Sequence, residues 1–217
     1  MKNINWDLYF ITEESLAAGR KTIEVVKQTA AAGVDVIQLR EKKMSLREKF
    51  KLGKKIKKIC KQHKIDFIVN DRVDLALALD ADGVHLGQTD LPLQTAREIL
   101  GPDKIIGLSA WKNQEILAAE AGGADYLGVG SIFKTDSKNL NPEKNGIGVN
   151  KIREIRNQSK LPLIAIGGLN KDNSSQVIKS GADCISVITA INRAKNISQE
   201  TAEFKKIIKR AKSKRRA

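Results

Sequence analysis

The sequence predicts an α/β protein, a (β/α)8 TIM barrel that forms one domain over residues 1–217. Eight short apolar runs alternate with eight helical segments along the chain. The apolar runs are continuous rather than interrupted by polar residues at every second position, which is typical of parallel strands buried on both faces by helices. Eight such units in 217 residues suit a compact closed barrel.

A repeated turn supports the same fold class. The turns that lead into the even-numbered strands resemble one another: Gly33-Val34-Asp35, Asp80-Ala81-Asp82, Gly123-Ala124-Asp125 and Gly181-Ala182-Asp183. This internal repeat indicates a structural unit of two strands. An open doubly wound sheet is the alternative, but no strand leads into a Gly-x-Gly-x-x-Gly turn.

The elements follow from the apolar pattern and from the residues that start or stop a helix. Gly33 ends the first helix, and Pro92 stands in the first turn of another. The strands are expected at residues 8–12, 34–40, 67–69, 83–87, 104–109, 125–130, 161–166 and 184–188. The helices are expected at 15–32, 45–63, 73–79, 92–100, 113–121, 149–158 and 172–179, with a basic helix at the C-terminal end. Residues 131–148 form the longest irregular stretch, and a polar loop of this length is usually functional or disordered.

Composition narrows the class of protein. The chain begins without an apolar run of signal-peptide length, and no stretch reaches the roughly 20 apolar residues of a membrane span. A cytoplasmic protein with no membrane partner is therefore expected. Cys60 and Cys184 fit neither a disulfide framework nor a metal-binding spacing, so both are expected to be buried thiols. The oligomeric state stays open between a monomer and a small homo-oligomer.

The net charge of +14 is the one unusual feature of the composition. It suits a polyanionic partner such as nucleic acid, attraction of phosphorylated substrates, or simply a lysine-rich surface. Few aromatic residues are interleaved with the basic ones, so the chain offers no stacking platform for single strands. No nucleic acid is therefore expected as a partner. The basic residues from about 211 to 217 are expected to form a frayed tail.

Two carboxylates follow neighbouring strands. Asp71 comes after the run that ends in Val69 and Asn70, and Asp90 comes shortly after the run that ends in Gly87. Parallel strands joined by a helix open on the same side, so Asp71 and Asp90 are expected to meet in one mouth. Two carboxylates with amide side chains nearby suit a divalent cation such as Mg²⁺. The alternative is that Asp71 caps the next helix and Asp90 begins a turn.

The other strands add polar residues at the corresponding ends. In a barrel these residues share the face where active sites are built. The set mixes carboxylates, cations and donors that suit phosphate groups: Gln38, Arg40, Lys42, Asn70, Asp71, Gln88, Asp90, Ser109, the loop 135–138, Gly167, Gly168 and Thr189. The two glycines lie where barrels commonly hold a phosphate on backbone N–H groups.

These segments resemble the thiamine-phosphate synthase family over residues 8 to about 191. The motifs that carry the resemblance are Gln38-Leu39-Arg40-Glu41-Lys42, Asn70-Asp71, Gly83-Val84-His85-Leu86-Gly87-Gln88-x-Asp90, Gly107-x-Ser109, Thr135-x-Ser137-Lys138 and Ala165-Ile166-Gly167-Gly168. The resemblance implies a transferase that couples hydroxymethylpyrimidine diphosphate with a thiazole phosphate, plain or carboxylated. Thiamine phosphate and pyrophosphate would be the products.

The resemblance also implies roles for individual residues. Asp71 and Asp90 would hold Mg²⁺ on the diphosphate, and the catalytic group would comprise Arg40, Lys42, Ser109 and Lys138. The pyrimidine diphosphate would contact Gln38, Leu39, Arg40, Glu41, Lys42, Asn70, Ser109 and Lys138. The thiazole phosphate would contact Thr135, Asp136, Ser137, Gly168, Ile188 and Thr189.

The chain departs from the family pattern in a few places. Trp111 stands where a histidine is common, Ser131 and Lys134 where prolines are common, and Thr189 where a serine is usual. Two other functions are weighed against the synthase. A related thiazole tautomerase would not need Asp71, Asp90 and Lys138 together, and a basic nucleic-acid-binding protein would bind in a steeply salt-dependent way.

Overall fold

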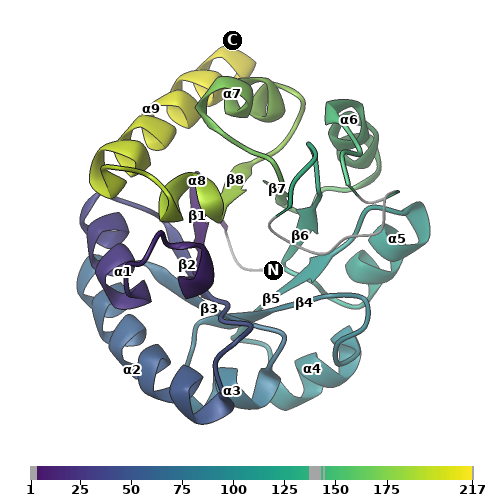
Figure 1. The fold of residues 1–217 in the computed structure, drawn as a ribbon. Helices are drawn as coiled ribbons and strands as arrows, with labels where there is room; N and C mark the ends of the chain where they lie inside the picture. The colour runs from purple at the N-terminus through teal and green to yellow at the C-terminus, as the bar shows by residue number, and fades with distance from the viewer. Residues whose placement is uncertain (1–3, 137–142, 144, 217) are drawn as a thin grey trace.

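The computed structural model describes residues 4–136, 143 and 145–216 and confirms the predicted barrel. All eight strands pair in parallel and in sequence order, and β8 pairs with β1, where Leu8 lies opposite Ile185. Figure 1 shows the closed ring of strands with the longer helices outside it and the short helix α8 beside β8 and β1. The strands are β1 Leu8–Ile11, β2 Val36–Leu39, β3 Asp66–Asn70, β4 Gly83–Leu86, β5 Ile105–Ser109, β6 Tyr126–Val129, β7 Leu163–Ile166 and β8 Cys184–Val187.

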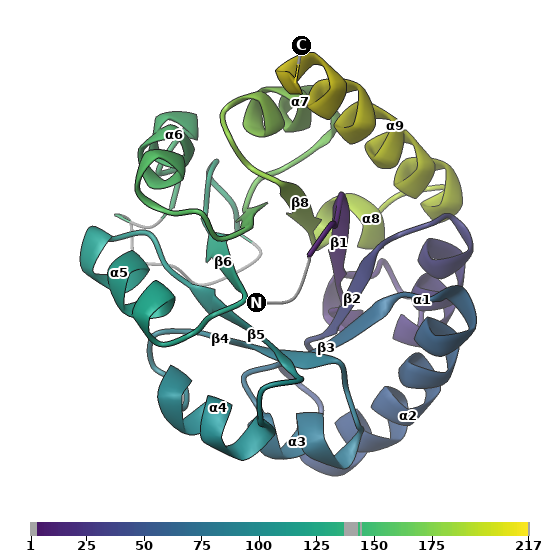
Figure 2. The ribbon, with the colours of Figure 1, turned by 180° about the vertical axis from the view of Figure 1, so that it is seen from behind.

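The helices form the outer layer, which Figure 2 shows from behind. They are α1 Thr22–Ala31, α2 Leu46–His63, α3 Val73–Ala78, α4 Leu93–Leu100, α5 Asn113–Ala121, α6 Val149–Gln158, α7 Lys171–Lys179, α8 Thr189–Asn192 and α9 Ile197–Arg216, with a 3-10 turn, η1, at Glu14–Leu16. Among the described residues, no helix is long and apolar enough to cross a lipid bilayer.

The apolar residues form two cores because strand side chains alternate between the two faces of the sheet. The larger core lies between the strands and the helices and includes Phe67, Ile106 and Phe204. The smaller core fills the barrel interior and includes Trp6 and Tyr126. Both cysteines are buried free thiols, as the sequence predicted.

The repeated turn has a structural purpose. In each copy, the aspartate before an even-numbered strand accepts a hydrogen bond from a backbone N–H where the preceding odd-numbered strand begins. Asp82 Oδ2 accepts from Phe67 N at 2.8 Å, and Asp125 Oδ2 accepts from Ile106 N at 2.9 Å. Asp35 and Asp183 do the same for Leu8 and Leu163. Each of the four aspartates also pairs with a cation: Asp35 with Lys205, Asp82 with Lys57, Asp125 with Arg97, and Asp183 with Arg156.

The first helix is shorter than the sequence predicted. The chain makes the turn η1 and then two residues with positive φ, Ala18 and Gly19, before α1 starts at Thr22. Two carboxylates stabilise this break, because Glu41 accepts a hydrogen bond from Glu14 N and Glu14 accepts one from Thr22 N. A continuous helix over 15–32 is therefore replaced by a turn and a ten-residue helix.

The C-terminal residues also differ from the expectation of a frayed tail. Helix α9 continues to Arg216, and Ala211 is buried. Lys212 reaches the start of β1, where Nζ lies 2.6 Å from Asp7 Oδ1 and 3.0 Å from the Trp6 carbonyl oxygen. Arg215 pairs with Asp183 at 3.0 Å. These contacts dock the last turns of the helix on the barrel.

Candidate active site

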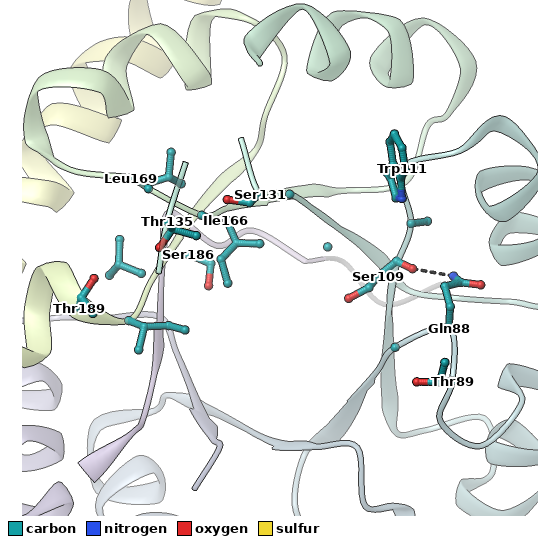
Figure 3. Close-up of a pocket in the computed structure, with 18 residues that line it drawn as sticks. Gln88, Thr89, Ser109, Trp111, Ser131, Thr135, Ile166, Leu169, Ser186 and Thr189 are labelled. Carbon is teal, nitrogen blue, oxygen red and sulfur yellow. Dashed lines mark hydrogen bonds between the residues drawn. The ribbon is translucent and has the colours of Figure 1, made fainter. Parts of the chain in front are cut away.

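The carboxyl ends of the strands surround a pocket of about 240 Å³. Five residues that the sequence singled out for substrate binding line it together: Ser109, Thr135, Gly168, Ile188 and Thr189. Figure 3 shows Ser109, Gln88 and Trp111 on one side and Thr135, Leu169 and Thr189 on the other. Residues from β5, β7, β8 and the loop after β6 therefore face the same space.

The side of the pocket next to β7 is built around two glycines with positive φ, Gly167 at 99° and Gly168 at 62°. A Cβ atom on Gly168 would lie 2.7 Å from the Lys134 carbonyl oxygen and 2.7 Å from Phe133 Cβ. Phe133 N donates to the Gly167 carbonyl oxygen at 3.1 Å, which joins the loop after β6 to this turn. The chain therefore needs glycine here, and the turn presents backbone rather than side chains to the pocket.

The loop after β6 is fixed at Thr135 by a residue that the sequence did not single out. Thr135 N donates to Asn145 Oδ1 at 2.9 Å, and Asn145 Nδ2 donates to the Thr135 carbonyl oxygen at 3.3 Å. Asp136 is exposed. Two other predicted residues, Ser137 and Lys138, lie outside the described residues.

The barrel interior lies beneath the pocket and holds Gln38. A second cavity of about 30 Å³ is lined by Gln38, His85 and Tyr126, and it shares Ser109 and Ser186 with the pocket above. Gln38 is buried and donates from Nε2 to the Tyr9 hydroxyl at 2.7 Å. Ser109 Oγ lies 2.9 Å from His85 Nε2. Gln38 and Ser109, which the sequence placed on the pyrimidine side, therefore border one cavity.

The two predicted metal ligands lie together at the mouth, as expected. Asp71 and Asp90 interact directly through their carboxylates, and Lys42 Nζ lies 2.7 Å from Asp71 Oδ2. Asp90 Oδ2 also accepts a hydrogen bond from Gly87 N at 2.6 Å. Neither carboxylate caps α3, whose N-cap is Arg72.

The two carboxylates differ in their affinity for a proton. Burial raises the pKa of Asp90, and the neighbouring charge of Asp71 raises it further. Burial acts in the same direction on Asp71, but the hydrogen bond and the charge of Lys42 outweigh it and lower the pKa of Asp71. Two like charges in one place disfavour ionisation of the pair, and a cation between them would remove that cost.

The donor set fits Mg²⁺. Among the described residues, no group of three or more His, Cys, Asp or Glu side chains is arranged to hold a metal ion. Mg²⁺ does not require such a group, because it is commonly held by one or two carboxylates together with water and substrate phosphates. Asp71 and Asp90 supply this type of site.

The remaining predicted residues near β2 and β3 have other contacts. Arg40 is buried, and its Nη1 pairs with Glu13 Oε2 at 2.9 Å. Glu41 is buried as well, and its carboxylate accepts hydrogen bonds from Thr22 Oγ1 and Glu14 N. Leu39 packs in the core between strands and helices. Asn70 ends β3 and is half-buried beside Asp71.

Two pocket residues show which parts of the site the sequence does and does not indicate. Trp111 lines the pocket, and the sequence draws attention to it because a histidine is common at this position in the family. Ser186 lines both cavities but was not singled out, although it is the one hydroxyl within the apolar run of β8 and alternates with the inward-facing Cys184. That alternation is the signal that could have found it.

Comparison with known proteins identifies the family of this chain. Residues 8–191 match the model of a family described as thiamine monophosphate synthase. The thiamine-phosphate synthase of Moorella thermoacetica is 46% identical over 209 residues, which cover 96% of this chain and 99% of that protein. The enzyme of the same name from Haloarcula marismortui is 44% identical over 192 residues, covering 88% and 91%.

A solved structure gives the same result. The thiamine phosphate pyrophosphorylase of Pyrococcus furiosus superposes with a TM-score of 0.86 at 40% identity, covering 95% of this chain and 97% of that one. The chain therefore belongs to the thiamine monophosphate synthase family.

Proposed function

We propose that this protein is a thiamine-phosphate synthase that joins hydroxymethylpyrimidine diphosphate to a thiazole phosphate, plain or carboxylated. One observation carries the proposal beyond family membership. A cation and two adjoining carboxylates, Lys42, Asp71 and Asp90, stand at one side of the barrel mouth, while the Gly167-Gly168 turn stands at another. This arrangement suits two phosphorylated substrates that are held by different means.

The diphosphate would be held at the charged side. Asp71 and Asp90 would ligate Mg²⁺, which when bound would neutralise negative charge on the departing pyrophosphate. Lys42 would add a second positive charge beside the same group. Lys138 and the N–H groups of Arg40 not engaged by Glu13 would bind further phosphate oxygens. Removing one such contact typically costs about 3 kcal/mol of barrier.

The pyrimidine would lie over Gln38 and Ser109, and the thiazole phosphate would lie against the Gly167-Gly168 turn near Thr135 and Thr189. The bond between the pyrimidine methylene carbon and the diphosphate oxygen breaks, and its electron pair leaves with the pyrophosphate. The electron-rich aminopyrimidine can stabilise the cation that remains. The thiazole nitrogen then supplies the electron pair of the new carbon–nitrogen bond, so the step requires no strong base. With the carboxylated thiazole, the carboxylate also leaves as carbon dioxide. Because the enzyme holds the thiazole phosphate next to the pyrimidine, the two substrates react as if in one molecule, which lowers the barrier.

The substrates of this enzyme are small phosphorylated molecules, and no nucleic acid or membrane partner is part of the proposal. Because both substrates carry charged phosphate groups, we expect the enzyme to work in the cytoplasm, where such molecules are retained.

The test is release of pyrophosphate from the pyrimidine diphosphate, with and without the thiazole phosphate, in Mg²⁺ and then in EDTA. Release that requires both substrates and the metal supports the proposal. Absence of release under every condition contradicts it, and a thiazole tautomerase assay without Mg²⁺ then tests the related activity. Turnover in that second assay would assign the barrel to isomerisation.

A further inference from the structure

Five side chains form a continuous line of hydrogen bonds across the barrel interior. Gln38 Nε2 lies 2.7 Å from the Tyr9 hydroxyl, which lies 3.0 Å from the Tyr126 hydroxyl. The Tyr126 hydroxyl lies 3.0 Å from His85 Nδ1, and His85 Nε2 lies 2.9 Å from Ser109 Oγ. The line begins and ends at the two residues proposed to contact the pyrimidine. Its three middle members have no assigned role.

The surroundings fix this line in place. Tyr9 and Tyr126 are buried, and the Trp6 ring packs edge-on against both, with centroids 5.7 and 5.3 Å away. The His85 ring stacks on Tyr126 at 5.5 Å. Two glycines leave the necessary room on neighbouring strands: a Cβ atom on Gly107 would overlap the Tyr126 ring, and one on Gly128 would lie 2.7 Å from His85 Cε1.

The line has a direction, because each hydroxyl has one hydrogen to donate. The Tyr9 oxygen receives the Gln38 N–H, and in the described part of the chain the Tyr9 hydroxyl contacts only one other polar atom, the Tyr126 oxygen. Tyr9 therefore donates to Tyr126, and Tyr126 donates to His85 Nδ1. Burial raises the pKa of both phenols, so both keep the hydrogen that this order requires.

The last link sets the role of Ser109. A neutral imidazole that accepts at Nδ1 carries its hydrogen on Nε2. His85 Nε2–H then donates to Ser109 Oγ, which leaves the serine hydrogen free to point elsewhere. Ser109 lines both the pocket and the smaller cavity beneath it, so an acceptor atom of a bound molecule can receive that hydrogen.

We propose that Tyr126 and His85 are positioning residues: Tyr126 holds His85 as the Nε2–H tautomer, and His85 thereby makes Ser109 a hydrogen-bond donor to the diphosphate substrate. The inference about the substrate rests on the proposed function. The inference about the tautomer does not, because it concerns the protein without substrate.

The tautomer is measured directly by ¹⁵N NMR of the histidine side chains. The chain has two histidines, and His63→Gln removes the exposed one, so that the remaining signals belong to His85. In the free protein we expect a pyrrole-like Nε2 and a pyridine-like Nδ1. The opposite pattern, or an imidazolium at neutral pH, overturns the proposal whether or not the enzyme makes thiamine phosphate.

Two tyrosine variants test the cause. Tyr126→Phe removes the donor to Nδ1, so we expect the two ¹⁵N signals to move toward the averaged values of mixed tautomers. Tyr9→Phe also removes one buried hydroxyl but leaves the Tyr126 hydroxyl facing His85, so the Nε2–H form should persist. Far-UV circular dichroism checks that both variants fold. Equal signals in Tyr126→Phe and the parent protein contradict the assignment.

Kinetics then test the link to Ser109. We expect Tyr126→Phe to lower kcat about tenfold and to leave KM for the thiazole phosphate unchanged. If Tyr126 acts through Ser109, the double variant Tyr126→Phe/Ser109→Ala has the same rate as Ser109→Ala alone. Rate losses that multiply in the double variant show independent roles and overturn the positioning role, as does a Tyr126→Phe variant with full activity.

Discussion

At the scale of single residues, Asp71 combines an unusual backbone conformation with the proposed metal site. Its φ is 63°, in the left-handed region where Asn and Asp are enriched. Asp71→Asn therefore keeps a compatible backbone and removes only the charge. We expect Mg²⁺-dependent pyrophosphate release to fall at least about a hundredfold and the thermal midpoint to change little, because the partner Lys42 is largely exposed.

Asp80 provides a matched control for this prediction. It also has positive φ, at 46°, and also pairs with a lysine, Lys104. Its side chain is exposed and lines neither the pocket nor the interior cavity. Asp80→Asn is expected to leave both turnover and stability unchanged. A loss of folding in Asp71→Asn would assign that aspartate to the structure instead of to the metal.

The two tryptophans make a contrasting pair. Trp6 Nε1 donates to Asp66 Oδ2 at 2.7 Å, whereas Trp111 Nε1 is buried without a hydrogen-bond partner among the described residues. A buried unpaired donor costs about 1–3 kcal/mol, which offsets the packing lost on replacement by a smaller ring. We expect Trp111→Phe to change the free energy of unfolding by less than about 0.5 kcal/mol and Trp6→Phe to lower it by about 3 kcal/mol. Urea unfolding measures both, and equal losses would contradict the difference.

At the scale of elements, the aspartate repeat joins each odd-numbered strand to the strand after it. Asp125 is the most buried of the four, with its side chain 7% exposed, whereas that of Asp82 is 35% exposed. Removing one partner of a buried ion pair costs about 3–5 kcal/mol, and an exposed pair contributes about 1 kcal/mol or less. Asp125→Ala should therefore destabilise the barrel about three times as much as Asp82→Ala in urea unfolding. Each aspartate also accepts a hydrogen bond from a backbone N–H. Equal losses of stability would mean that this hydrogen bond, and not the ion pair, makes the larger contribution to the free energy of unfolding.

Docking of α9 should depend on pH through Asp7, which accepts from Lys212 and pairs with Lys205. Burial acts to raise the pKa of Asp7, but the hydrogen bonds and charges of the two lysines outweigh it, so the pKa lies below its ordinary value of 3.8. A lowered pKa in the folded state stabilises the fold at pH values above the unfolded-state pKa. This stabilisation is lost as the pH falls through the folded-state value.

Asp7→Asn isolates this effect. At pH 7 we expect the variant to be less stable than the parent protein by about 2 kcal/mol. The difference should shrink below about pH 4, as measured by urea unfolding at several pH values. A difference that stays constant down to pH 2 would contradict the ionic origin.

The elements also show what the sequence could predict. The eight strands follow from continuous apolar runs, since burial on both faces leaves few other patterns. The break before α1 and the order in the last turns of α9 could not be foreseen, because both depend on partners distant in sequence: Glu41 for η1, and Asp7 and Asp183 for α9. In the site, family motifs identified residues at the mouth, but the contact between Arg40 and Glu13 and the line through Tyr9 and Tyr126 required the fold.

At the scale of the whole molecule, the net charge of +14 is concentrated on two outer helices. Helix α2 carries eight Lys and Arg residues against one acidic residue, Glu48, and α9 carries eight against Glu200 and Glu203. Several α2 lysines, including Lys51, Lys55 and Lys58, are exposed. A field of this sign would raise the local concentration of an anionic substrate and accelerate its encounter with the barrel.

This argument predicts that kcat/KM for the pyrimidine diphosphate falls as ionic strength rises. The exposed lysines of α2 act on the substrate from a distance, and the screening length is about 10 Å at 0.1 M salt. Their effect on kcat/KM should therefore appear mainly below that concentration. The triple variant Lys51→Gln/Lys55→Gln/Lys58→Gln removes three of these charges without changing a residue of the pocket. It should lower kcat/KM at about 20 mM salt by roughly two- to fivefold, converge with the parent protein near 0.3 M, and keep the same kcat. If the two proteins respond identically to salt, the lysines of α2 serve only as a solvated surface, and the salt dependence that remains belongs to residues of the mouth such as Lys42.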